Sequence, residues 1–256
     1  MLKALAIASG KGGVGKTTIA VNLALTQAIN DKCLLLDADM GMANAHILLG
    51  LNPELTVREV IEGKISLEKA IVKGPNDLNF ISGGSGITEL LSIDNKKKFN
   101  FIRSFNSISK TISNLIIDVS AGAENTALNM ISASDKILIV LLNEPTSFMD
   151  AFTLIKVCNL ELKFKEFCIV TNMVNSENQG KEIYKKFNAI VTKFYDVNIT
   201  YVGSILMMPD IKNSIIKKKP AVLDSKNSNI KSLFSRVLEN IRNAPFNNNN
   251  GIKFFN

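Results

Sequence analysis

Residues 10–17 have the composition and spacing of a loop that binds phosphate. They fit the pattern G-x-x-x-x-G-K-[ST] as Gly10, Lys11, Gly12, Gly13, Val14, Gly15, Lys16 and Thr17, and a second threonine, Thr18, follows. An apolar run precedes the loop and a helical pattern follows it, which is the context that this motif requires. The glycines let the backbone turn its N–H groups toward a phosphate. Lys16 should then reach the β- and γ-phosphates of a nucleotide, and the Thr17 hydroxyl should bind Mg²⁺.

Three aspartates follow apolar runs of strand length. Asp37 and Asp39 end the run LLLDAD, and Asp118 ends the run LIID. Ligands of doubly wound sheets lie outside the carboxyl ends of the strands, so we expect these carboxylates to face the phosphate loop. Asp118 suits the Mg²⁺ side of the site, acting through water, and Asp37 could support the same shell. Asp39 could orient the water that attacks the γ-phosphate.

The run FCIVTN bears on which base the site would bind. GTP-binding proteins usually follow such a strand with Asn-Lys-x-Asp, whose aspartate recognises guanine. Here Asn172 is followed by Met173, Val174 and Asn175, so the lysine and the aspartate are absent. This favours adenine, with Asn172 as a base contact. An asparagine that only caps the strand is the alternative interpretation.

The remaining pattern predicts the elements that would position these residues. Strands are expected at 4–9, 33–37, 78–82, 114–119, 136–142, 167–172 and 199–205. Helices are expected near 16–29, 56–62, 66–71, 86–92, 98–112, 125–132, 147–158, 178–194, 210–216 and 230–241. This alternation predicts an α/β fold with a doubly wound, mostly parallel sheet flanked by helices on both faces. We expect one domain over residues 1–242, then an Asn-rich tether and short tail over 243–256.

The composition restricts the classes of protein to which this chain can belong. The chain of 256 residues is 46% hydrophobic and has a net charge of +7, with lysine clusters at 96–98 and 217–219. These clusters suit solvated faces, or contact with anionic lipid or nucleic acid. Cys33, Cys158 and Cys168 are widely spaced, which suggests buried thiols in a reducing cytosol and argues against an iron–sulfur site. A cytoplasmic protein is therefore expected.

The extra lysine of the loop resembles a family signature. The pattern K-G-G-x-G-K-[ST], with Lys11 as its first residue, resembles the deviant Walker A motif of the MinD/ParA/Mrp ATPases. DADMGMANAHILLG (37–50) resembles their switch I, and DVSAG (118–122) resembles their switch II, which ends at Gly122. The resemblance implies an ATP hydrolase that forms a homodimer around ATP. It also implies that Lys11 of one subunit reaches the nucleotide of its partner, with Lys16 and Asp39 completing the catalytic set.

Further stretches resemble particular branches of this family. MPDIKNSIIKKKPAVL (207–222) resembles the loop and helix beside the adenine, which implies contacts from Pro209 and Asp210. DADMGMANAHILLGL (37–51), ISGGSGITEL (81–90) and NEPTSFMDAFTLIK (143–156) resemble the FlhG branch, whose members regulate flagellar number and placement. That branch implies an FlhF-like GTPase or flagellar components as partners. The alternatives are a ParA-type ATPase that binds DNA, and a MinD-type regulator of the division site.

The last residues suggest a membrane contact. Ile252, Phe254 and Phe255 offer apolar bulk and Lys253 offers a cation, a mixture that suits an anionic membrane surface. We therefore expect a flexible tail that places the protein peripherally on the inner face of the cytoplasmic membrane. A disordered tail without this function is the alternative.

Overall fold

The computed structural model describes residues 3–39, 44–84, 95–224, 226, 228–247 and 251–255. Within these residues eight strands form one sheet in the order β3-β4-β2-β5-β1-β6-β7-β8. Their bounds are β1 (Ala4–Ala8), β2 (Cys33–Ala38), β3 (Val72–Lys73), β4 (Asn79–Ile81), β5 (Asn114–Val119), β6 (Lys136–Leu141), β7 (Glu166–Val174) and β8 (Asn198–Leu206). Every pairing is parallel except that of the edge strand β3 with β4. The doubly wound, mostly parallel sheet predicted from the sequence is confirmed.

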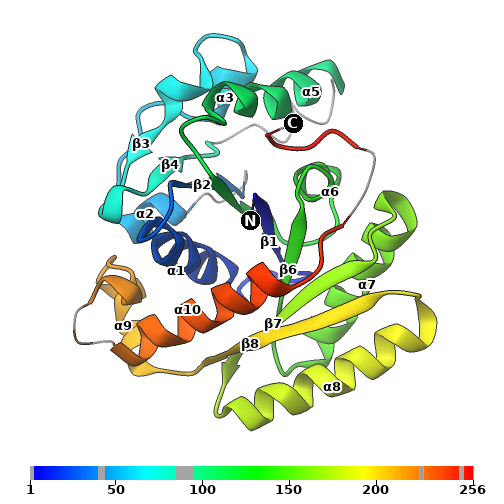
Figure 1. Ribbon diagram of the computed structural model, residues 1–256. Coiled ribbons are helices and arrows are strands. Elements are labelled where there is room, and N and C mark those ends of the chain that lie inside the picture. Colours follow the sequence, from blue (N-terminus) through cyan, green and yellow to red (C-terminus); the bar gives the residue numbers. More distant parts are fainter. Residues whose placement is uncertain are drawn as a thin grey trace.

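Helices cover both faces of this sheet (Figure 1). The α-helices are α1 (Lys16–Ala28), α2 (Ala45–Leu49), α3 (Val57–Ile61), α5 (Asn95–Ser104), α6 (Asn125–Ser132), α7 (Pro145–Leu162), α8 (Glu177–Phe194), α9 (Pro209–Ile216) and α10 (Ser228–Asn243). Short 3₁₀ helices are η1 (Leu67–Ala70), η2 (Pro75–Asp77), η3 (Phe105–Ile108) and η4 (Ala221–Leu223). The helix expected at 86–92 lies outside the described residues.

Two hydrophobic cores explain why the central strands are apolar throughout. Along β1, Leu5 and Ile7 pack into the core beneath α1 and α10, while Ala4, Ala6 and Ala8 pack into the core beneath α5, α6, α7 and α8. Successive side chains of a strand point to opposite faces, so a strand covered on both sides has no solvent-facing position. The carboxyl ends of these strands form the edge where the functional site lies.

In the C-terminal segment Phe254 packs against the domain, which corrects the prediction that its side chain contacts a membrane. Phe254 is 1% exposed, and its ring centroid lies 4.8 Å from that of Phe105 in an edge-to-face contact. The Phe254 N–H donates to the Ala133 carbonyl at 3.0 Å. Phe255 packs against the same core, whereas Ile252 remains 40% exposed. The buried Phe254 is therefore a core residue and not a membrane contact, whereas a membrane contact of the exposed Ile252 stays a prediction.

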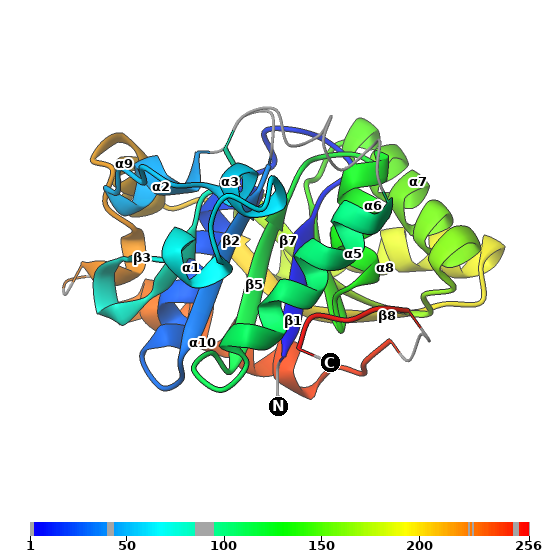
Figure 2. The same ribbon diagram turned by 90° about the horizontal axis from the view of Figure 1, so that it is seen from above.

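Asn247 fastens the start of this segment. Its side-chain oxygen accepts hydrogen bonds from the backbone N–H groups of Lys165 and Glu166, and its nitrogen donates to the Glu166 carbonyl. Figure 2 shows residues 251–255 at the edge of the sheet where β1 begins, opposite the phosphate loop. The segment therefore completes the base of the fold, far from the candidate site.

Candidate nucleotide site

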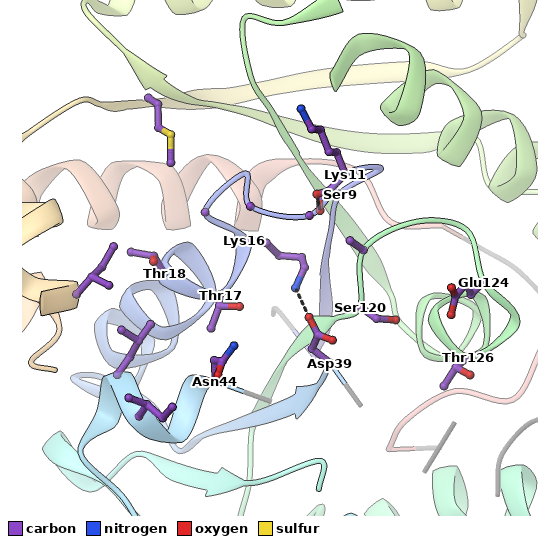
Figure 3. Close-up of a pocket in the computed structure, with 18 of the residues that line it drawn as sticks. Ser9, Lys11, Lys16, Thr17, Thr18, Asp39, Asn44, Ser120, Glu124 and Thr126 are labelled. Atoms are coloured by element: carbon purple, nitrogen blue, oxygen red, sulfur yellow. Dashed lines mark hydrogen bonds and ion pairs between the residues drawn. The ribbon is translucent and has the colours of Figure 1, made fainter. Parts of the chain in front are cut away.

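The phosphate loop joins β1 to α1 and borders a cavity of about 750 Å³ (Figure 3). Gly15 has φ +86° and immediately precedes α1, and a Cβ there would lie 2.4 Å from Asn172 Nδ2. A Cβ on Gly10 would clash with the backbone of Asp150. Gly15 and Gly10 are therefore required by the protein's own packing. A Cβ on Gly12 or Gly13 would meet no atom within 4 Å, so this part of the loop is an open cradle.

Lys16 lies between two carboxylates at the floor of the cavity. Its ammonium nitrogen is 2.6 Å from Asp118 Oδ1 and 3.8 Å from Asp39 Oδ2, and the side chain is 6% exposed. Asp118 is fully buried, and burial raises its pKa, while the charge of Lys16 and hydrogen bonds from Lys16 and Thr17 lower it. The structure thus brings together the loop lysine, the loop threonine and the two predicted aspartates.

Asp37 lies beside Asp118, because the two residues are register partners on β2 and β5. It accepts backbone hydrogen bonds from Asp39 at 3.2 Å and from Ala45 at 3.0 Å. Burial and the charge of Asp118 raise its pKa to about 7. Since each oxygen of Asp37 already accepts a backbone N–H, this residue positions the start of α2, and its predicted place in the Mg²⁺ shell stays a prediction.

The donor groups fit Mg²⁺ that arrives with a nucleotide. Asp118 Oδ2 is buried without a hydrogen-bond partner among the described residues, close to Thr17. In the described part of the chain no group of three or more His, Cys, Asp or Glu side chains is placed to hold a metal ion. Such a site suits Mg²⁺, which keeps waters and phosphate oxygens as ligands and needs few protein groups.

Lys11 turns away from Lys16 (Figure 3). Its ammonium nitrogen lies 3.0 Å from Glu144 Oε2 and 3.3 Å from Thr146 Oγ1, at the junction of β6 and α7. The Lys11 side chain is 42% exposed. The two lysines of one loop therefore have different surroundings, one enclosed with carboxylates and one on the rim.

A second, apolar cavity of about 340 Å³ adjoins the first, and both are lined by Gly15, Thr18, Met173 and Ile215. Asn172 lines this second cavity, is 6% exposed, and donates from Nδ2 to the Val14 carbonyl at 2.7 Å. It thereby fastens the phosphate loop to β7, a role that the sequence did not reveal.

The structure does not bring Pro209 and Asp210 into either cavity. The wall is formed instead by Met207, Met208, Ile211 and Lys212. Asp210 lies on the other side of α9, where it lines a small cavity with Asn213 and Lys217. Helical periodicity separates these two faces, so the neighbours of the predicted contacts provide the wall.

Other lining residues were not singled out from the sequence, although most of them lie in the stretches that resemble switch I, switch II and the loop beside the adenine. They are Asn44, Ile47 and Leu48 around α2, Ser120, Ala121 and Glu124 between β5 and α6, Thr126 in α6, and Lys218 after α9. Gly122, which has φ +92°, donates its N–H to the Ser9 carbonyl at 2.8 Å and so ties the switch II stretch to the phosphate loop.

Comparison with known proteins agrees with this geometry. Residues 1–242 match the family model ParA, described as NUBPL iron-transfer P-loop NTPase. The chain belongs to the ParA family of P-loop NTPases. The resemblance to MinD/ParA ATPases stated from the motifs is confirmed, and with it the prediction of an ATP hydrolase.

Individual relatives cover most of the chain. The antiactivator FleN of Pseudomonas aeruginosa is 31% identical over 245 residues, which are 95% of this chain and 88% of that protein. The flagellum site-determining protein YlxH of Helicobacter pylori is 28% identical over 85% of this chain and 74% of its own length. The septum site-determining protein MinD of Pyrococcus horikoshii, solved in complex with Mg-ADP, superposes with a TM-score of 0.75. It is 22% identical and covers 93% of this chain and 95% of that one, which shows a shared fold.

The cysteines do not suit an iron-binding site within this family. Cys33, Cys158 and Cys168 are free and buried. Burial raises the pKa of Cys158 and of Cys168 to about 12, and among the described residues no cysteine belongs to a group of three or more potential metal ligands. Among the described helices none is long and apolar enough to cross a membrane.

Proposed function

We propose that this protein binds Mg·ATP, dimerises around it, and hydrolyses it to regulate flagellar number and placement. The observation that carries the proposal is that the Lys16 and Lys11 side chains point in different directions (Figure 3). Lys16 is then available to the nucleotide of its own subunit, and Lys11 is available to the nucleotide of a facing subunit. The flagellar role is supported by the similarity to FleN and YlxH over most of the chain. An FlhF-like GTPase or a flagellar component would be the partner.

Within one subunit, Lys16 would exchange Asp118 for the β- and γ-phosphates. The exchange keeps the ammonium group paired with an anion, and it leaves Asp118 and Thr17 to hold the hydrated Mg²⁺ side of the site. Mg²⁺ would neutralise charge that develops on the transferred phosphoryl group. Asp39 is 25% exposed, so its carboxylate is accessible to the attacking water.

The orientation of Asn172 favours adenine. The Val14 carbonyl can only accept a hydrogen bond, so the amide nitrogen of Asn172 must face it and the side-chain oxygen is left for the base. That oxygen can accept from the exocyclic amine of adenine, whereas guanine presents a carbonyl at the same position. The apolar wall formed by Met173 and its neighbours suits the faces of a purine.

The ion pair of Lys11 is easily exchanged. Both partners are exposed to solvent: the Lys11 side chain is 42% exposed and the Glu144 side chain is 49% exposed. Exposed pairs of this kind contribute about 0–1 kcal/mol, so a nucleotide phosphate on a facing subunit could displace Glu144 at little cost. Lys11 would then act across the dimer.

Molar mass measured by light scattering in ATP and in ADP tests the proposal. We expect a dimer in Mg·ATP and a monomer in Mg·ADP, and Lys11→Ala should weaken the dimer more than it weakens ATP binding. Lys163→Ala, an exposed lysine at the far end of α7, is the matched control. A wild-type protein that stays monomeric in saturating Mg·ATP would contradict the dimer. Unchanged flagellar number and placement after deletion of the gene would contradict the cellular role.

A further inference from the structure

The turn after α9 carries three consecutive lysines that point in different directions. Lys218 lines the nucleotide cavity, beside Ile215 and opposite Ile47 and Leu48 of α2. Lys217 and Lys219 line the small cavity on the other side of α9, together with Asp210 and Asp224. Lys218 and its two neighbours therefore line different cavities.

The backbone turns between these lysines. Lys218 has φ +50°, a left-handed conformation that glycine usually provides at this position after a helix. The Lys218 N–H donates to the Ile215 carbonyl at 3.1 Å, and the Lys219 N–H donates to the Ser214 carbonyl at 3.0 Å. These two bonds form a Schellman turn, which Pro220 follows. Lysine adopts the same conformation at Lys163, where φ is +58°, so the role of Lys218 is indicated by the cavity that it lines and not by its backbone.

The surroundings of Lys218 suit an anion. The acidic residues of the cavity, Asp39 and Glu124, lie toward β2 and α6, away from α9 (Figure 3). The Lys218 ammonium group forms no ion pair with a described residue. The Lys218 carbonyl is 3.9 Å from where a Cβ on Gly50 would lie, so the turn is close to the end of α2.

We infer that Lys218 is a nucleotide-binding residue that contacts the α-phosphate and covers the ribose. A nucleotide with its terminal phosphates at Lys16 and its base against Met173 and Ile215 would pass Thr18, and its α-phosphate and sugar would face Lys218. The ammonium group would donate a charge-assisted hydrogen bond to the α-phosphate, and the aliphatic stem would pack on the sugar. This inference rests on the proposed binding of ATP.

Isothermal titration of the full chain with ATP, ADP and adenosine tests the inference. Asparagine tolerates the left-handed conformation, so Lys218→Asn removes the cation without new strain. We expect the Kd for ATP and for ADP to rise by the same factor, roughly tenfold, since both carry the α-phosphate, with little change for adenosine. Lys218→Arg should bind nearly as the wild type, and the matched controls Lys217→Asn and Lys219→Asn should stay within about twofold.

A second variant separates binding from folding. Lys218→Gly relieves the left-handed backbone, so its melting temperature should equal or exceed that of the wild type while its affinity for ATP falls. Wild-type affinity in Lys218→Asn, or equal losses in all three asparagine variants, would overturn the inference and leave ATP binding standing. Absence of ATP binding by the wild type would instead overturn the proposed function and this inference with it.

Discussion

Replacing Lys16 by methionine should affect stability and nucleotide binding in ways that can be separated. The change leaves Asp118 fully buried with no cation beside it. Removing one partner of a buried ion pair costs about 3–5 kcal/mol, a large part of the 5–15 kcal/mol that stabilises a typical domain. Since burial already raises the pKa of Asp118 and Lys16 opposes that effect, the pKa should rise further in Lys16→Met.

The loss of stability in Lys16→Met should therefore depend on pH. In the unfolded chain Asp118 ionises at its ordinary pKa, which is lower than its pKa in the folded protein. A raised folded-state pKa therefore gives a stabilising contribution to the free energy of unfolding at acid pH, where Asp118 is protonated. That contribution is lost as pH rises through the folded-state value. Lys16→Met should be closer to wild type at about pH 5.5 than at about pH 8. Asp37 contributes to this difference, because the charge of Lys16 also lowers the pKa of Asp37. The double variant Lys16→Met/Asp118→Asn has no Asp118 carboxylate left to ionise, and Asp37 loses the neighbouring charge that raises its pKa, so the variant should regain stability at the higher pH without regaining ATP binding.

Urea unfolding followed by circular dichroism, without nucleotide, measures these differences. Calorimetric titration with Mg·ATP measures binding in the same variants. A single variant with the wild-type midpoint at both pH values would refute the electrostatic argument. A double variant no more stable than the single one at about pH 8 would refute it as well.

Three further predictions concern other parts of the molecule. Asp39→Ala should bind Mg·ATP yet hydrolyse it roughly 10²-fold or more slowly, so that ATP dimers accumulate on size exclusion; normal turnover in a monomer would exclude the assigned role. Gly12→Ala should keep the wild-type melting temperature but weaken ATP binding, because its Cβ enters the open cradle, whereas Gly15→Ala should lower the melting temperature through its contact with Asn172. Phe254→Ala should cost about 3–5 kcal/mol in urea unfolding with ATP affinity unchanged, against less than about 0.5 kcal/mol for the exposed control Ile252→Ala. Equal losses in these last two variants would show that Phe254 is not a core residue.

The motifs of the sequence predicted the centre of the site because their chemistry is local. A loop with fixed glycines and a lysine, preceded by a strand, has few alternative uses, and the parallel strands then bring Asp37, Asp39 and Asp118 to the same edge. The apolar runs predicted the sheet because strands buried on both faces are apolar throughout and do not alternate apolar with polar residues.

Contacts between distant segments could not be predicted in this way. Asn172 was expected to contact a base, but its bond to Val14 depends on how closely β7 approaches the loop. Lys136 begins an apolar run, yet it is 1% exposed and its ammonium group donates to the carbonyls of Ile241 and Arg242 at the end of α10. Phe254 follows four asparagines, and only its fit against Phe105 shows that it is a core residue.

Complementation between two inactive variants tests the central claim, that Lys11 acts on the nucleotide of a partner subunit. In a mixed dimer of Lys11→Ala and Asp39→Ala subunits, the nucleotide of the Lys11→Ala subunit has its own Asp39 and receives Lys11 from its partner. One of the two sites is then complete, so an equimolar mixture should regain roughly a quarter of the wild-type ATPase activity, given random pairing in a symmetric dimer. If Lys11 served its own nucleotide, neither site would be complete, and a mixture no more active than the separate variants would contradict the account.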